Sequence, residues 1–272
     1  WTRRWTAGFR YDRARFAPAD TALVGPLPDD RTLALPYMRL DLLQDDYVTA
    51  HNLDQIGRTE DLRFGTQLSA ELGVSQAALG ANRNAFVASL GASRGYRLVH
   101  EQSLFLAGSW GSRLEGGSLR DSLLSVSSRY FWRASGKTVL FVGFAADKGS
   151  ALDLDHELML GGDTGLRGYP LRYQTGTARA LLTVEGRYFT NWYPLRLARV
   201  GAAVFADIGR TWGASALAVP ELGTLRDVGI GLRFGNTRSA LGNVLHVDLA
   251  FPLDGDPSVK SMQFLLKTYK SF

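Results

Sequence analysis

The sequence predicts an all-β chain, specifically an antiparallel transmembrane β-barrel of about twelve strands. About twelve segments alternate between apolar and polar residues, with the period of two that belongs to strands and not the 3.6 of helices. The segments are long enough to span a bilayer at a tilt, which takes about nine to eleven residues, whereas strands of soluble proteins average about five or six. No stretch between them has convincing helical periodicity.

The first half of the chain supplies seven of these segments. In the third, Leu62 and Leu68 fall on one face while Arg63 and Glu71 fall on the other. In chain order the seven segments lie near residues 1–12, 36–48, 61–74, 84–95, 102–115, 120–134 and 137–148.

The second half supplies five more, and its alternation is cleaner. In the second of these, Val200, Val204 and Ile208 share a face opposite Phe205 and Asp207. The five segments lie near residues 179–190, 197–210, 225–235, 243–254 and 262–272.

Two architectures fit this alternation. In a soluble sandwich or small barrel the apolar faces point inward, whereas in a membrane barrel they meet lipid and the polar faces line a hydrated interior. The segment length favours the membrane barrel, and so do polar faces that mix Gly, Ser, Asp, Glu and Arg. Aromatic residues gather near segment ends, as at residues 130–132 and at Trp192 and Tyr193, as in interfacial girdles. Closure would also remove the exposed edges of such long strands.

Composition excludes several function classes. The 272 residues include no cysteine, so disulfides and thiolate metal sites are impossible. The formal charge is +5, but basic and acidic residues are interspersed, so we expect no nucleic-acid partner. No run of about 18 to 20 apolar residues could form a membrane-spanning helix. The opening WTRRWTAGFR lacks the apolar core of a secretory signal, which leaves a mature chain, a fragment or a cytosolic protein.

The stretch LGGDTGLRGYPLRYQTG, residues 160–176, lies between the seventh and eighth segments and combines five glycines with Arg167. Glycines permit the positive φ angles and close backbone approach that an inserted loop requires. A guanidinium can hold a carboxylate through two parallel hydrogen bonds. The alternation places Glu185 and Asp207 on the lumen face. The alternative is that Arg167 is an ordinary solvated loop arginine.

The motif LRGYP, with Arg167, Gly168 and Tyr169, resembles the arginine-tipped sixth loop of the BamA, TamA and FhaC superfamily of outer-membrane assembly and translocation barrels. That resemblance implies a loop folded into the lumen, with Arg167 paired to acidic residues on the next two strands. Glu185 in LLTVEGRYF occupies the first position, and Asp207 in VFADIGRTWG occupies the second. With Gly209, Asp207 fits the family's FxDxG pattern.

The final segments resemble the same superfamily. RDVGIGLRFG and VLHVDLAFPL are similar to its penultimate strands, and Phe272 is similar to the terminal aromatic residue of the outer-membrane assembly signal. Lys270 departs from that signal, which is usually more apolar there. In the insertase mechanism that the resemblance implies, first and last strands form a weakly paired seam, which here includes Phe264, Leu266 and Phe272.

The chain also departs from the superfamily, whose members usually have about sixteen strands preceded by POTRA repeats. About seven segments precede the arginine loop instead of eleven, with no room for a POTRA repeat. We therefore expect one domain over residues 1–272, either a smaller barrel of about twelve strands or a truncated piece.

The resemblance implies an outer-membrane protein that assists insertion or translocation of protein or lipid, with no catalytic residue and no cofactor. The expected partners are outer-membrane lipid and, as open possibilities, client polypeptides and further copies of the chain. Two alternatives remain: a membrane-anchoring or translocator barrel for a patatin-type phospholipase or other passenger enzyme, and a passive pore for small solutes.

Other motifs carry less weight. GASRG at residues 91–95 spells a nucleophile elbow around Ser93, but the following residues predict a strand and not the required helix. LDLDHE, with Asp153, Asp155, His156 and Glu157, could bind a hard cation, be a solvated loop or anchor the arginine loop. No histidine pair has zinc spacing. The glycines at 229, 231 and 235 belong to a strand face, since no helix follows to form a phosphate site. We expect no metal site.

Overall fold

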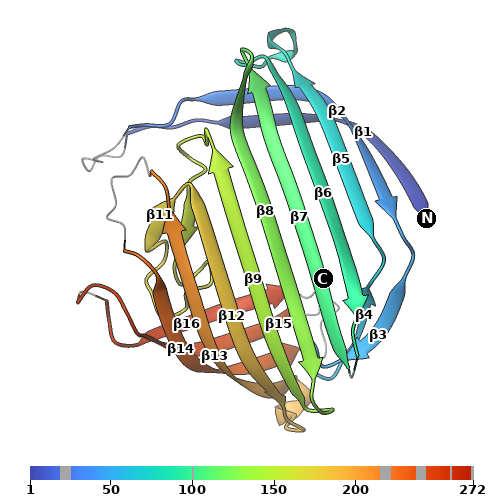
Figure 1. The fold of residues 1–272 in the computed structure, drawn as a ribbon, viewed down its shortest axis with the longest axis vertical. Helices are drawn as coiled ribbons and strands as arrows, with labels where there is room; N and C mark the ends of the chain where they lie inside the picture. Colours follow the sequence, from blue (N-terminus) through green and yellow to red (C-terminus); the bar gives the residue numbers. More distant parts are fainter. Residues whose placement is uncertain (19–25, 100, 215–221, 237–242, 258, 271–272) are drawn as a thin grey trace.

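The computed structural model describes residues 1–18, 26–99, 101–214, 222–236, 243–257 and 259–270. Its main element is one antiparallel sheet of twelve strands (Figure 1), which confirms the all-β class and the strand number. The sheet order is β1-β2-β5-β6-β7-β8-β9-β12-β13-β14-β15-β16. Among the described residues, no helix reaches the length and apolarity needed to cross a membrane.

The twelve strands of the main sheet are long and follow one another mostly as neighbours. They are β1 (Thr2–Ala14), β2 (Arg31–Leu43), β5 (Gln67–Ser75), β6 (Ala85–Arg97), β7 (Gln102–Glu115), β8 (Ser118–Arg133), β9 (Thr138–Ser150), β12 (Ala178–Phe189), β13 (Ala198–Trp212), β14 (Leu225–Asn236), β15 (Asn243–Pro252) and β16 (Gln263–Lys270). Two short hairpins and two single-turn helices complete the fold: β3 (Tyr47–His51) with β4 (Thr59–Arg63), β10 (Leu158–Leu160) with β11 (Gln174–Gly176), η1 (Ala77–Leu79) and η2 (Pro194–Arg196).

Each of the twelve predicted segments overlaps one strand of the sheet, but three boundaries are wrong. The second segment was expected to run to residue 48, whereas β2 ends at Leu43 and residues 47 and 48 belong to β3. The second segment was expected from Pro36, yet β2 begins at Arg31 and pairs with β1 through the proline. Its ladder with β5 starts only at Tyr37, after the residue that has no N–H to contribute. The third segment was expected from residue 61, but its first residues belong to β4 in a separate hairpin.

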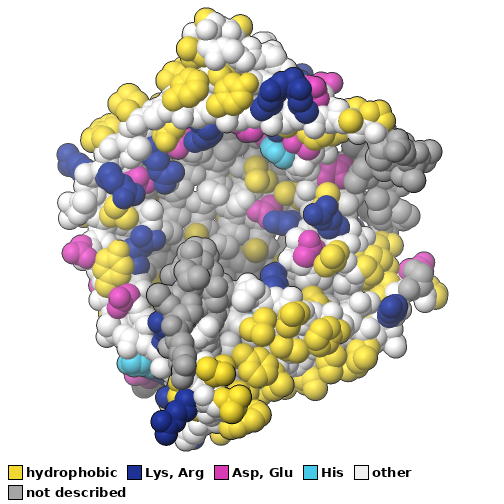
Figure 2. Space-filling model, turned by 180° about the vertical axis from the view of Figure 1, so that it is seen from behind, with side chains coloured by type: hydrophobic (Ala, Val, Ile, Leu, Met, Phe, Trp, Pro, Cys, Tyr) yellow, Lys and Arg dark blue, Asp and Glu magenta, His cyan; other side chains and the backbone are white. Residues whose placement is uncertain are grey.

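The two faces of the sheet differ in the way a membrane barrel requires. Along β13, exposed Val204, Ala206 and Ile208 alternate with buried Phe205 and Asp207. The same inversion occurs elsewhere, with exposed large apolar residues on one face and buried charges on the other. We call these the outer and inner faces. Figure 2 shows the inner side as a hollow bordered by acidic and basic side chains.

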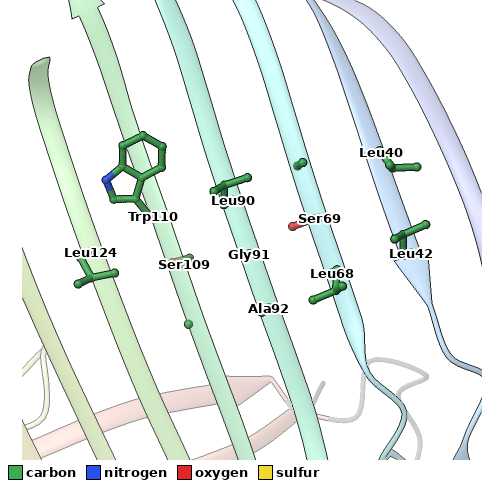
Figure 3. A pocket seen from close by; sticks show the side chains of 12 residues that line it. Leu40, Leu42, Leu68, Ser69, Leu90, Gly91, Ala92, Ser109, Trp110 and Leu124 are labelled. Carbon is green, nitrogen blue, oxygen red and sulfur yellow. The ribbon is translucent and has the colours of Figure 1, made fainter.

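Part of the outer face lies over β2 and β5–β8, where a shallow apolar pocket of about 480 Å³ opens (Figure 3). Leucines and Trp110 surround the small residues Ala92 and Gly108, which leave the space of the pocket. Surfaces this apolar on a strand array are suited to hydrocarbon and not to water.

The two edges of the sheet are β1 and β16. Among the described strands no ladder joins them, so closure of the sheet into a complete barrel stays a prediction. On β16 the predicted seam residues Phe264 and Leu266 are each 64% exposed on the outer face. Phe272 lies outside the described residues.

The hairpin β3–β4 and the turn between its strands form a compact element that the sequence did not predict. Leu53 and Ile56 of this turn are buried against Phe131 of β8, Phe189 of β12 and Val244 of β15. We call residues 47–63 the β3–β4 hairpin. It connects β2 to β5, yet it packs against strands far along the sheet.

Candidate functional site

The loop between β10 and β11 folds into a compact unit on the inner face. The amide of Leu166 donates to the carbonyl of Gly161 at 3.0 Å, and the amide of Gly162 donates to that of Pro170 at 3.1 Å. A Cβ at Gly161 would lie 2.3 Å from the Pro170 carbonyl oxygen, so only glycine allows this crossing of the backbone. Leu166, 0% exposed, and Tyr169, 1% exposed, anchor the loop in an apolar cluster.

The guanidinium of Arg167 reaches carboxylates on the neighbouring strands β12 and β13 and approaches a third on β15. Its Nε and Nη2 donate to the two oxygens of Asp207 at 2.7 and 3.1 Å, in the parallel two-bond arrangement. Its Nη1 donates to Glu185 Oε2 at 2.9 Å and approaches Asp248 Oδ2 at 3.4 Å. All four residues are buried. The structure thus brings together Arg167, Glu185 and Asp207, the three residues singled out from the sequence.

An aromatic ring supports the same guanidinium from one side. The guanidinium carbon of Arg167 lies 3.3 Å from the ring centroid of Phe205, within the range of a cation–π contact. The ring can lie flat because Gly229 stands beneath it, where a Cβ would be 2.3 Å from the ring. Phe205 is the aromatic residue of FxDxG, so that motif supplies both a carboxylate and a platform for Arg167.

The remaining residues of the predicted set hold the loop in place. A Cβ at Gly168 would lie 2.6 Å from the Cβ of Asp227, so glycine lets the loop approach β14. The hydroxyl oxygen of Tyr169 lies 2.8 Å from the carbonyl oxygen of Arg226 and 3.0 Å from that of Asp254, so its single O–H can donate to either carbonyl. Gly209 faces the loop, where a Cβ would lie 3.3 Å from a methyl of Leu166.

Three charged residues that the sequence reasoning missed extend the site. Glu185 also accepts from Arg187 at 3.0 Å and pairs with Arg233 at 3.2 Å, while Arg233 in turn pairs with Asp248. In the sequence, both Arg233 and Asp248 alternate with the apolar residues of their segments. The alternation therefore contained the signal for these residues but not for their partners.

Burial by itself would lower the pKa of Arg167. The hydrogen bonds and charge of Asp207, followed by the charge of Glu185, outweigh that effect and raise the pKa above its ordinary value. The loop arginine is therefore a permanent cation that holds two acidic strands together.

The LDLDHE segment forms a second ionic cluster near the end of β9. Arg31 binds Asp155 at 3.0 and 3.2 Å and also binds Asp153, while Arg113 contacts Asp153 at 2.8 Å. Of the three readings of this segment, these contacts favour the anchoring one. Asp121, Asp153 and His156 could place three ligand atoms within 4.8 Å of one another, but the two arginines already take the Asp153 oxygens.

His156 of this cluster hydrogen-bonds to Asp121 through Nδ1 at 2.8 Å. That hydrogen bond raises the pKa of His156, although partial burial acts in the opposite direction.

Ser93 lies inside β6, in register with Gln67 and Ala107. A position in mid-strand is not the strand-to-helix turn that a nucleophile elbow requires.

No family model matches this sequence, and no curated protein matches it. Among solved structures, the chain is similar to CdiB from Escherichia coli, with a TM-score of 0.56 and 14% sequence identity. The match covers 98% of this chain and 49% of that protein, so the chain spans about half its length. At this level of identity the likeness concerns the fold alone.

Proposed function

We propose that this chain is an outer-membrane β-barrel of the BamA/TamA superfamily that assists the insertion or translocation of protein or lipid. The observation that carries the proposal is the hold of Arg167 on Asp207 and Glu185, at the positions that the superfamily motif requires. The apolar outer face supports the membrane location.

In this proposal the arginine loop is a lock inside the lumen. The loop also touches the edge of the sheet, because Lys267 Nζ of β16 donates to the Asp163 carbonyl at 2.8 Å. A change in the loop can therefore reach the edge strand directly. No ladder joins β1 and β16 among the described residues, so these edge strands offer backbone groups to which a client strand can add by β-augmentation.

Conductance in planar bilayers tests the lock. We expect the wild type to conduct little and Arg167→Ala to conduct more, because the loop loses its hold on the strands. Arg172→Ala is the matched control, since Arg172 belongs to the same loop but its side chain is 70% exposed. Equal conductance in the wild type and the Arg167 variant would refute the lock.

Reconstitution tests the activity. Vesicles of phosphatidylethanolamine and phosphatidylglycerol that contain the chain should speed the folding of a small urea-unfolded outer-membrane barrel, followed by its gel mobility without heating. Arg167→Ala should reduce the effect more than Arg172→Ala. A chain that conducts but does not speed folding would favour the passive pore. A chain that does neither would favour the anchoring barrel.

A further inference from the structure

The β3–β4 hairpin and the arginine loop lie at opposite ends of the sheet. Strand directions alternate, and β2 and β9 stand an odd number of places apart in the order. The hairpin follows β2 and the arginine loop follows β9, so the chain leaves the sheet at opposite ends to form them. The two inserted elements thus enter the inner side from different directions.

The tip of the hairpin has an ordered structure of its own. The carboxylate of Glu60 accepts hydrogen bonds from the amides of Leu53 at 2.8 Å and Asp54 at 2.9 Å. The side chain of Asn52 accepts from the amide of Gly57 at 2.7 Å. Glu60 is only 4% exposed. These bonds fix a turn that keeps its shape when it packs against other strands.

This turn reaches across the inner side to the far strands. Ile56 is 2% exposed, and a Cβ built at Gly235 of β14 would lie 3.0 Å from its Cβ. Asp54 pairs with Arg129 of β8 at 3.2 Å and with Arg187 of β12 at 3.1 Å. A hairpin rooted between β2 and β5 is therefore held by β8, β12 and β14.

One chain of ion pairs connects the hairpin to the arginine loop. Arg187 donates to the Leu53 carbonyl at 2.7 Å and to Glu185 Oε1 at 3.0 Å. Glu185 uses its other oxygen to accept from Arg167 at 2.9 Å. Arg187 thus divides its guanidinium between the hairpin and Glu185. Without Arg167, Glu185 relies on Arg187 and Arg233 alone, so its attraction for Arg187 would compete more strongly with the hairpin.

We propose that the β3–β4 hairpin is a second plug, which closes the end of the lumen opposite the arginine loop, and that release of the loop loosens it through Glu185 and Arg187. This inference rests on the proposed function in taking the inner side as a lumen. It adds a second closure at the other end of the lumen, which loosens when the arginine loop is released.

Thiol labelling tests the coupling, since the natural chain has no cysteine. The rate at which a small methanethiosulfonate reagent labels Ile56→Cys in the reconstituted chain should rise by roughly tenfold when Arg167→Ala is added. Adding Arg172→Ala should leave the rate unchanged. Ala50→Cys, at a position 6% exposed, serves as a second reporter in case the first variant folds poorly. Equal labelling in both backgrounds would refute the coupling, even where Arg167→Ala raises conductance.

A disulfide tests the closure. The Cβ atoms of Ile56→Cys and Gly235→Cys would lie 3.0 Å apart. This is slightly less than the roughly 3.5 to 4.5 Å of a disulfide, so a small shift of the turn brings the pair into bonding range. Combined with Arg167→Ala, the oxidised pair should conduct less than the same protein after reduction, because the tether holds the plug in place. The Ile56→Cys single variant should not respond to reduction. If conductance of the double-cysteine protein is the same before and after reduction, the hairpin does not close the lumen.

Discussion

Replacing Arg167 by alanine removes the cation at the centre of the site. The variant loses three hydrogen bonds of 2.7 to 3.1 Å and the stack on Phe205. Breaking a buried ion pair from one side costs about 3 to 5 kcal/mol, because the partner charge stays buried. We expect a loss of that order in the free energy of unfolding.

The loss should fall mainly on Asp207. Glu185 keeps Arg187 and Arg233, whereas the contacts that Asp207 retains include the Thr183 hydroxyl at 2.7 Å and no second arginine within salt-bridge distance among the described residues. Adding Asp207→Asn to the alanine variant should therefore restore part of the stability. A double-mutant cycle should give a coupling of about 1 to 3 kcal/mol.

Urea unfolding in detergent micelles, followed by tryptophan fluorescence, measures these differences. Arg172→Ala should stay within about 0.5 kcal/mol of the wild type, as exposed substitutions usually do. The reasoning fails if Arg167→Ala matches that control or if the two substitutions at positions 167 and 207 are simply additive.

His156→Asn should lower the unfolding temperature at about pH 5.5 and not at about pH 9. The pKa of His156 is raised in the folded state, so the charged imidazole stabilises the fold at low pH and this stability is lost as the pH rises above that pKa. An equal loss at both pH values would contradict this. Gly229→Ala should cost about 1 to 3 kcal/mol in urea unfolding by overpacking, whereas Gly108→Ala, whose Cβ would meet no atom closer than 3.7 Å, should cost much less; similar losses would count against a tight ring platform. If the outer face meets hydrocarbon, Val204→Arg should lower the free energy of unfolding in vesicles by about 2 to 4 kcal/mol, whereas Ser127→Arg on the inner side should not. The reverse order would overturn the assignment of faces.

The alternation of the sequence was sufficient to predict the long strands. Predicted segment 102–115 coincides with β7, and the polar face assigned to Asp207 is the buried one. Successive residues of a strand point to opposite faces, so alternation in the sequence shows which face is apolar. The apolar face of each strand is in turn required by the surroundings of the sheet.

The same alternation could not reveal the β3–β4 hairpin. Apolar and polar residues alternate in its strands as they do in the neighbouring strands, so the pattern does not show that the sheet stops at Leu43 and resumes at Gln67. The alternation also places Arg187 and Asp248 on the inner face without naming their partners, because ion pairs between distant strands depend on how the sheet curves.

The ionic network also has a consequence for the order of folding. The contact between Arg187 and Leu53 joins residues 134 apart, and that between Arg167 and Asp248 joins residues 81 apart. Contacts so distant in sequence require most of the intervening ladders to form first, since closing long loops costs entropy that only completed pairing recovers. We expect these bonds to appear late, so that their formation marks a sheet whose assembly is nearly finished.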